Sequence, residues 1–126
     1  MVTVGVPSRA WLFFSPSGRV SRAPYALGLI FWFSLQAAAT GQMFAGDSQD
    51  SDGLLVLGFL GLVVSALIGV VSMVMLTIKR VHDMGYSGLL ALLVFVPIIS
   101  FPALACFLLW PSSPPNRFGA HPNRPA

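Results

Sequence analysis

The stretch LLVLGFLGLVVSALIGVVSMVMLTI, residues 54–78, contains no charged residue. At about 1.5 Å per residue, a helix of this length extends about 37 Å, which exceeds the ~30 Å hydrocarbon core of a bilayer. Such a helix crosses a membrane by tilting or by placing one end among the headgroups. The stretch therefore predicts a transmembrane helix, and its end runs into the charged sequence IKRVHDMGYSG, residues 78–88.

Two further apolar blocks flank this stretch, over residues 25–44 and 89–110. Each has about 20 residues without a charge, which is enough for a helix to span the bilayer. Pro97 and Pro102 interrupt the later block. Membrane helices tolerate proline where neighbouring groups satisfy the freed carbonyls, so we expect a kinked span. A re-entrant hairpin that turns near PIISFP, residues 97–102, is the alternative.

The composition agrees with a membrane protein. Of the 126 residues, 56% are hydrophobic and 9% are charged, whereas soluble domains carry roughly a quarter charged residues. We therefore predict an all-α integral membrane protein with three transmembrane helices. An amphipathic N-terminal segment, residues 1–23, precedes the transmembrane domain, residues 24–110. A flexible proline-rich tail, residues 111–126, follows it.

Lysine and arginine indicate the orientation of a membrane protein because cytoplasmic loops carry an excess of them. With three spans, one side of the membrane holds most of the basic residues and the other holds Arg117 and Arg124. We therefore expect a cytoplasmic N-terminus and a C-terminus outside. A hairpin in residues 89–110 would bring the tail to the cytoplasmic side as well. The basic residues of the expected cytoplasmic side are Arg9, Arg19, Arg22, Lys79 and Arg80.

Small residues recur every four positions within the central stretch, at Gly61, Ser65 and Gly69. This spacing places them on one face of a helix, where a second helix can approach closely. We favour packing against another helix of the same chain, since consecutive helices are usually neighbours. A second copy of the protein is the other option, and it would make the chain a subunit of a small oligomeric transporter or channel.

The charged stretch has ordinary reasons to end a helix. Lys79 and Arg80 lie where the helix dipole favours cations. Gly85 is placed to stop the helix in a left-handed conformation. His82 and Asp83 are less easily explained. We expect His82 at the headgroup level and Asp83 in an ion pair with an arginine; the candidate partners are Arg19, Arg22 and Arg80.

The chain has too few reactive residues to predict a metal site, a hydrolase site or a proton relay. A zinc site needs about three or four protein ligands, and His82 and Asp83 have only His121 as a further histidine. The chain contains no glutamate, a single cysteine at Cys106 and no G-x-S-x-G sequence. The apolar blocks contain no ionisable pair for a proton relay. We therefore expect no catalytic residue, no metal and no cofactor. The sequence also has no basic run with interleaved aromatic residues, so we expect no binding of nucleic acid.

The basic residues at the expected cytoplasmic face suggest a binding role. Arg19 and Arg22 precede the first apolar block, and Lys79 and Arg80 follow the second. Together with His82 and Asp83 they would form a polar cluster that binds anionic lipid headgroups or a protein partner. The plainer interpretation is that these side chains anchor the helices at the membrane surface, as basic residues do in membrane proteins generally.

Three separated motifs resemble the DUF805 family of small bacterial membrane proteins. FFSPSGRVSRAPY, residues 13–25, resembles the family's F-x-GR-x-x-R-x-x-Y/W opening. IKRVHDMGYSG resembles its (K/R)R-x-HD-x-G-x-SG motif, and NRFGAHP, residues 116–122, resembles its NR-Y-G-x-x-P motif. The matching positions are Gly18, Arg19, Arg22, Arg80, His82, Asp83, Gly85, Ser87, Gly88, Asn116, Arg117 and Gly119.

The resemblance implies a multi-pass protein of the bacterial inner membrane without an established activity. Two departures from the family pattern occur in this chain. Leu89 and Leu90 stand where the family often has tryptophan, and Phe118 stands where the family usually has tyrosine. The missing hydroxyl weakens any chemical role for that position, while the membrane assignment is unaffected.

Overall fold

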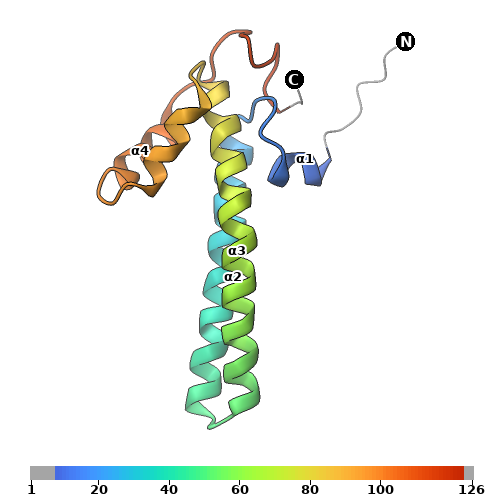
Figure 1. Ribbon diagram of the computed structural model, residues 1–126, viewed down its shortest axis with the longest axis vertical. Coiled ribbons are helices and arrows are strands. Elements are labelled where there is room, and N and C mark those ends of the chain that lie inside the picture. The colour runs from blue at the N-terminus through green and yellow to red at the C-terminus, as the bar shows by residue number, and fades with distance from the viewer. Residues whose placement is uncertain (1–7, 124–126) are drawn as a thin grey trace. The chain divides into compact units, whose positions relative to one another are not determined.

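The computed structural model describes residues 8–123 and divides into two compact units. The described residues of unit 1 are 8–28 and 72–123, and unit 2 is residues 29–71. They form helices and no strand, so the all-α prediction is confirmed for this part of the chain. In chain order the elements are α1 (Arg9–Phe14), α2 (Arg22–Ser48), α3 (Asp52–Asp83), the 3-10 helix η1 (Gly88–Phe95) and α4 (Ser100–Leu109) (Figure 1).

In unit 2, α2 and α3 run side by side in opposite directions (Figure 1). A short loop, residues 49–51, joins the two helices, and hydrogen bonds fix its backbone. The amide of Ser51 donates to the carbonyl of Gly46 at 2.8 Å, and the Ser51 hydroxyl accepts from the amide of Leu54 at 3.3 Å. The hydroxyl thereby caps the start of α3. Asp52 lies in the first turn of α3, where the helix dipole favours an acid.

One helix of the described chain, α3, is long and apolar enough to cross a membrane by length and composition. Its 32 residues would extend about 48 Å. The first predicted span, residues 25–44, lies within α2, which is less apolar because it carries Gln36, Thr40 and Gln42. The structure therefore supports a membrane helix in α3, and it does not confirm three transmembrane helices.

The small residues of α3 lie against α2 within unit 2. A side chain added at Gly69 would come within 3.0 Å of the Trp32 ring, and one added at Gly61 would contact Ala39 at 3.9 Å. The Ser65 hydroxyl accepts from the amide of Gln36 at 3.1 Å. This is packing between helices of the same chain, which we favoured from the sequence. It occupies the face of α3 that a second copy of the protein would need in the alternative of an oligomeric transporter or channel.

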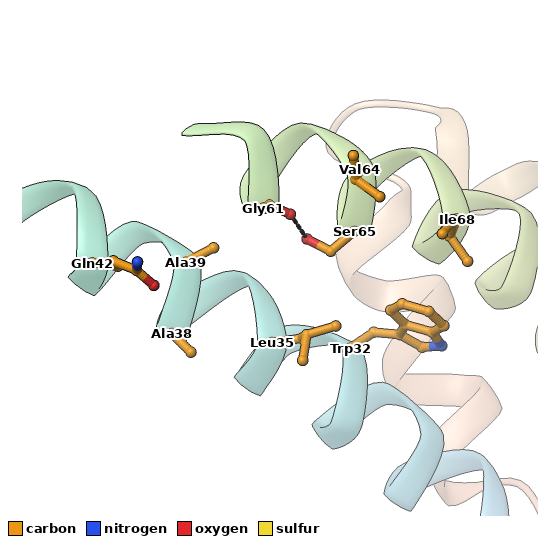
Figure 2. Close-up of a pocket in the computed structure, with 9 residues that line it drawn as sticks. All are labelled: Trp32, Leu35, Ala38, Ala39, Gln42, Gly61, Val64, Ser65 and Ile68. Carbon is orange, nitrogen blue, oxygen red and sulfur yellow. Dashed lines mark hydrogen bonds between the residues drawn. The ribbon is translucent and has the colours of Figure 1, made fainter. Parts of the chain in front are cut away.

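A groove of about 420 Å³ lies along the two helices of unit 2 (Figure 2). Its only hydroxyl, that of Ser65, also donates to the carbonyl of Gly61 at 2.6 Å, so this polar group is satisfied within the chain. No charged side chain lines the groove, and Gln42 is its other residue with a polar side chain apart from the Trp32 indole. The lining residues are Trp32, Leu35, Ala38, Ala39, Gln42, Gly61, Val64, Ser65 and Ile68.

The close approach of the helices predicts the effect of a methyl group. A Cβ at Gly58 would lie 2.8 Å from the backbone nitrogen of Met43, whereas a Cβ at Gly41 would meet nothing within 4 Å. Gly58→Ala should therefore lower the free energy of unfolding by about 1–3 kcal/mol through overpacking. Gly41→Ala should leave it unchanged or raise it by up to about 1 kcal/mol. Unfolding of both variants in mixed detergent micelles checks this, and equal effects would contradict the packing.

The third predicted span, residues 89–110, is not a continuous helix. Instead, η1 and α4 fold back on each other as a hairpin (Figure 1). Pro97 has no amide hydrogen and therefore cannot continue η1. The chain then reverses in a γ-turn centred on Ile98, whose φ is 71°. In this turn the amide of Ile99 donates to the carbonyl of Pro97 at 2.8 Å. The kinked span is therefore wrong, and the chain turns where the hairpin alternative placed the turn.

The hairpin changes the expected position of the C-terminal tail. With a third span, the tail would lie across the membrane from the N-terminal segment. The amide of Asn123 instead donates to the carbonyl of Arg19 at 2.7 Å, so the tail and the N-terminal segment lie together in unit 1. This contact agrees with the hairpin alternative, and the side of the membrane on which the C-terminus lies stays a prediction. The described tail forms no helix, as its composition predicts, but hydrogen bonds hold it.

Candidate functional site: a polar clasp at the end of α3

The site begins where α3 ends. Gly85 has a φ of 89°, a conformation that glycine adopts without steric cost. Its amide donates to the carbonyl of His82 at 3.0 Å, and the amide of Tyr86 donates to the carbonyl of Val81 at 3.1 Å. This left-handed stop, predicted from the sequence, ends the helix at Asp83. It leaves Asp83, which is completely buried, at the C-terminal end of α3.

A second segment, between α1 and α2, supplies Arg19. Gly18, with a φ of 91°, turns the chain after Ser-Pro-Ser. The amide of Val20 then donates to the carbonyl of Lys79 at 3.2 Å, which fixes the segment to the last turns of α3. Arg19 and Val20 are both completely buried.

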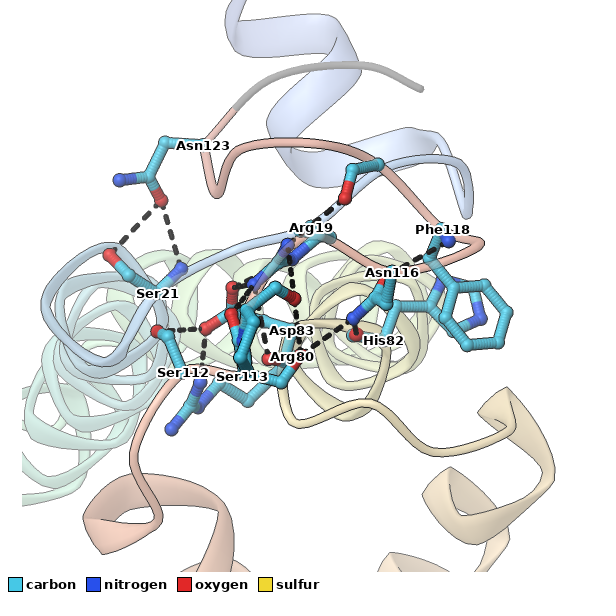
Figure 3. Close-up of polar contacts among 12 residues, drawn as sticks. Arg19, Ser21, Arg80, His82, Asp83, Ser112, Ser113, Asn116, Phe118 and Asn123 are labelled. Carbon is cyan, nitrogen blue, oxygen red and sulfur yellow. Dashed lines mark hydrogen bonds and ion pairs between the residues drawn. The ribbon is translucent and has the colours of Figure 1, made fainter.

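Asp83 lies between two arginines (Figure 3). Its Oδ1 accepts from Nε of Arg19 at 3.1 Å, and its Oδ2 accepts from Nη1 of Arg80 at 2.6 Å. None of the three side chains is exposed. Asp83 therefore pairs with two of the three arginines that the sequence offered as candidates. We refer to Arg19, Arg80 and Asp83, together with Ser112, Ser113 and Asn116 of the tail, as the clasp.

The rest of the Arg19 guanidinium donates to backbone carbonyls of the tail. Nη2 donates to Ser113 O at 2.5 Å, and Nη1 donates to Gly119 O at 3.0 Å and to Pro114 O at 3.3 Å. A side chain at Gly119, whose φ is 152°, would also contact the Arg19 side chain. The planar fork of arginine, with its five N–H donors, suits this set of acceptors.

Arg80 bonds to the end of α4, and prolines explain why carbonyls are free there. In a helix the Phe107 carbonyl would accept from residue 111, but Pro111 has no N–H. Nε of Arg80 donates to this carbonyl at 2.6 Å instead. Its Nη2 donates to the carbonyl of Trp110, which is followed four residues later by another proline, Pro114. Arg80 thus caps α4.

The tail caps α3 in return. The amide of Ser113 donates to the carbonyl of Asp83 at 2.7 Å, and the side-chain amide of Asn116 donates to the carbonyl of His82 at 3.0 Å. The Ser112 hydroxyl donates to Oδ2 of Asp83. Asn116 and Gly119 also bond to each other through both backbone amides, which closes a tight turn. The last carbonyl of α3, that of Asp83, thereby gains a backbone partner, and that of His82 gains a second one beside the Gly85 amide.

The clasp contains more positive than negative charge. Two guanidinium groups face one carboxylate, so the cluster carries a net formal charge of about +1. The C-terminal end of α3 and the carbonyls of α4 and the tail supply partial negative charge. Among the described residues, no buried side-chain nitrogen or oxygen is left without a partner. Each guanidinium nitrogen of Arg19 and Arg80 therefore already has a partner within the chain.

Lys79 is used in the same way, one residue before Arg80. Its ammonium group donates to the carbonyl of Trp11 at 2.5 Å and to that of Leu12, and it lies 4.4 Å from the centre of the Trp11 ring. The side chain is completely buried. Lys79 thus holds α1 against the end of α3, a contact that its sequence position did not reveal.

The His82 ring stacks on the tail. Its ring lies parallel to that of Phe118, with 3.9 Å between the ring centroids, and the Arg117 guanidinium lies 4.7 Å from the Phe118 ring. Nδ1 of His82 is 3.3 Å from the carbonyl of Gly18. No group of three His, Cys, Asp or Glu side chains gathers within residues 8–123. The stacking needs only an aromatic ring, so phenylalanine serves without the hydroxyl of tyrosine.

The predicted cluster therefore separates into two kinds of residue. Arg19, Lys79, Arg80 and Asp83 are buried, and each of their side-chain nitrogen and oxygen atoms has a partner. Arg22 is exposed, and its Nη1 reaches only the carbonyl of Leu109, at 3.4 Å. The sequence interpretation missed the two serines of the tail, Ser112 and Ser113. The prolines beside them signal only that carbonyls of residues 107 and 110 need donors, which Arg80 supplies.

The clasp brings together three segments that are far apart in the sequence: Arg19, the Arg80 to Asp83 region, and Asn116 to Gly119. A family model described as a protein of unknown function, DUF805, matches residues 13–120 and therefore includes all three. The chain belongs to the DUF805 family. No curated protein and no solved structure matches this DUF805 chain. Its three motifs are thus parts of one three-dimensional cluster.

Proposed function

We propose that this DUF805 protein is a non-enzymatic integral protein of the bacterial inner membrane that binds anionic lipid headgroups at its cytoplasmic face. In this proposal α2 and α3 cross the bilayer as a helical hairpin, and unit 1 lies at the cytoplasmic surface. The clasp has a structural role, because it holds the segment before α2, the tail and the ends of α3 and α4 together, while Lys79 holds α1. Exposed arginines outside the clasp contact the headgroups.

The separation of charge along the chain carries this proposal. Three of the four acidic residues, Asp47, Asp50 and Asp52, lie at the loop between α2 and α3, and the fourth is buried in the clasp. Unit 1 therefore exposes no acid among its described residues. It exposes three arginines: Arg9, Arg22 and Arg117. A basic end and an acidic end agree with a hairpin whose basic end faces the cytoplasm and its anionic lipids.

The surface of α2 and α3 supports the membrane location. Large apolar side chains on both helices are more than half exposed, among them Ile30 at 59%, Leu57 at 59% and Leu67 at 68%. Soluble proteins rarely expose apolar patches of this extent. Lipid chains would cover these side chains in a bilayer. The non-enzymatic part of the proposal is supported by the clasp, whose ionisable groups are buried and bonded to one another.

Spin-labelled lipids test the headgroup proposal. The full-length protein is reconstituted in phosphatidylcholine, and the fraction of labelled lipid held at the protein surface is compared for phosphatidylglycerol and phosphatidylcholine. We expect phosphatidylglycerol to be preferred, because each exposed arginine contributes about 1 kcal/mol, which is about fivefold in affinity. The combined change Arg9→Gln, Arg22→Gln and Arg117→Gln should remove the preference.

The matched control is the same triple change to lysine, which keeps the charge and should keep most of the preference. High salt should weaken the preference of the wild-type protein because it screens exposed charges. A preference that persists in the glutamine variant would defeat the proposal. Co-purification of a stoichiometric protein partner that depends on these three arginines would instead assign the basic face to that partner.

A further inference from the structure

The hairpin of η1 and α4 has the length of half a bilayer. The 8 residues of η1 extend about 16 Å at ~2.0 Å per residue, and the 10 residues of α4 extend about 15 Å. The hydrocarbon core of a bilayer is about 30 Å thick. Neither arm can cross it, and each matches the depth of one leaflet.

We propose that this hairpin inserts into the hydrocarbon of the cytoplasmic leaflet and turns near the middle of the bilayer. The inference rests on the membrane location proposed for α2 and α3. It adds a separate lipid contact, made by acyl chains instead of headgroups, in a part of the chain that does not cross the membrane.

The exposed surface of the hairpin is apolar along its whole length. Residues 89–110 contain no charged side chain. Three side chains of the hairpin are buried: Ala91, Ala103 and Phe107. Large apolar side chains point outward on both arms and at the turn. They include Leu89 at 74%, Leu92 at 58%, Phe95 at 56%, Ile98 at 83%, Phe101 at 78% and Leu109 at 73% exposure. Acyl chains are the covering that such a surface requires in a membrane protein.

Most backbone donors of the turn are absent or bonded, as a medium without water requires, and the amide of Ile98 is the exception. An amide without a partner is costly in hydrocarbon. Pro97 and Pro102 have no amide hydrogen, so two donors are removed at the turn and in the first turn of α4. The amides of Val96, Ile99 and Ser100 donate to carbonyls of Leu93, Pro97 and Val96 at 2.8–3.2 Å. The prolines that argued for a kinked span thus fit a re-entrant turn.

The base of the hairpin is fixed at the polar end of unit 1. Arg80 donates to the carbonyls of Phe107 and Trp110, and the amide of Ser113 donates to the carbonyl of Asp83. The start of η1 and the end of α4 therefore both lie beside the clasp. The clasp contains buried charges and lies next to exposed arginines. An apolar hairpin with a polar base and an apolar tip matches the change from headgroups to hydrocarbon within one leaflet.

Spin labels at single cysteines test the depth of the tip. Cys106 is the only cysteine, so Cys106→Ser gives a background without other thiols. Single cysteines are then introduced by Ile98→Cys at the tip, Tyr86→Cys at the base and Leu67→Cys in α3. The full chain is reconstituted in vesicles of phosphatidylcholine and phosphatidylglycerol. Accessibility to oxygen reports lipid, and accessibility to a water-soluble nickel chelate reports water.

We expect the label at residue 98 to be accessible to oxygen and protected from nickel, at about 15 Å below the phosphates. The label at residue 86 should be accessible to nickel. Access of nickel to residue 98 while residue 67 stays in lipid would overturn the hairpin proposal alone. Access of nickel to residue 67 would overturn the membrane location itself. Protection of residue 98 from both probes would show a protein covering and overturn the lipid contact.

A second measurement separates a re-entrant hairpin from a third span. Tyr86→Cys and Ala120→Cys lie before and after the hairpin, and both positions are exposed. A membrane-impermeant maleimide should label both cysteines from the same side of the membrane. Labelling from opposite sides would overturn the hairpin. Phe101→Cys, which is 78% exposed beside the turn, replaces Ile98→Cys if that variant fails to fold.

Discussion

Asp83→Asn is expected to cost about 3–5 kcal/mol of the free energy of unfolding, the largest effect of any single polar change considered for this protein. The side chain keeps its size and loses its charge. Two completely buried guanidinium groups, of Arg19 and Arg80, would then have no anion between them. The new amide would also direct donors at one of them, where the carboxylate accepted from both. Buried charges without compensation are among the most costly defects in a folded protein.

Unfolding of the variant in mixed detergent micelles measures the loss. Asp47→Asn is the matched control, because it makes the same substitution at an exposed position at the end of α2. The control should change stability by less than about 0.5 kcal/mol. A variant at Asp83 that is as stable as this control would show that the clasp does not depend on its carboxylate.

Arg19→Lys should cost about 2–3 kcal/mol although it keeps the charge. Arg19 donates to the Asp83 carboxylate, to the carbonyl of Asp83 and to three carbonyls of the tail. An ammonium group has three donors on one atom and cannot reach acceptors spread across a guanidinium plane. Several carbonyls of the tail would lose their partner, and the tail should become more accessible to protease.

Arg22→Lys provides the comparison three residues later, at an exposed arginine with one long hydrogen bond. It should leave both stability and protease resistance of the tail almost unchanged. Limited proteolysis followed by mass spectrometry locates the cleavage sites, and unfolding in micelles gives the stability. Equal behaviour of the two lysine variants would remove the distinction between clasp arginines and surface arginines.

The parts of the fold that local pattern determines could be predicted from the sequence. The charge-free run over residues 54–78 predicts the apolar helix, and Gly85 predicts its stop. The spacing of Gly61, Ser65 and Gly69 predicts the face on which helices approach. The arginines near the end of α3 had few possible acidic partners, because the three acids other than Asp83 all lie between residues 46 and 53. A single acid beside several arginines therefore predicts an ion pair from the sequence.

The remaining features depend on contacts between distant segments, which local patterns do not encode. Pro97 and Pro102 are compatible with a kinked helix and with a hairpin, and the structure combines the hairpin with bonds from Arg80, which is distant in the sequence, to the end of α4. The composition of the tail predicts irregular chain, and irregular chain can be free or bound. Its binding to Arg19 uses backbone carbonyls, which every sequence possesses, so no residue type announces it.

The contact between Arg19 and the tail has a consequence for the order of events during synthesis. Arg19 leaves the ribosome long before Ser113 and Gly119, whose carbonyls it binds. At about 5–20 residues per second, roughly 100 residues take about 5–20 seconds to add. Until then the Arg19 guanidinium lacks these carbonyl partners. The Arg19 bonds to the tail therefore form after most of the other contacts of the clasp can form.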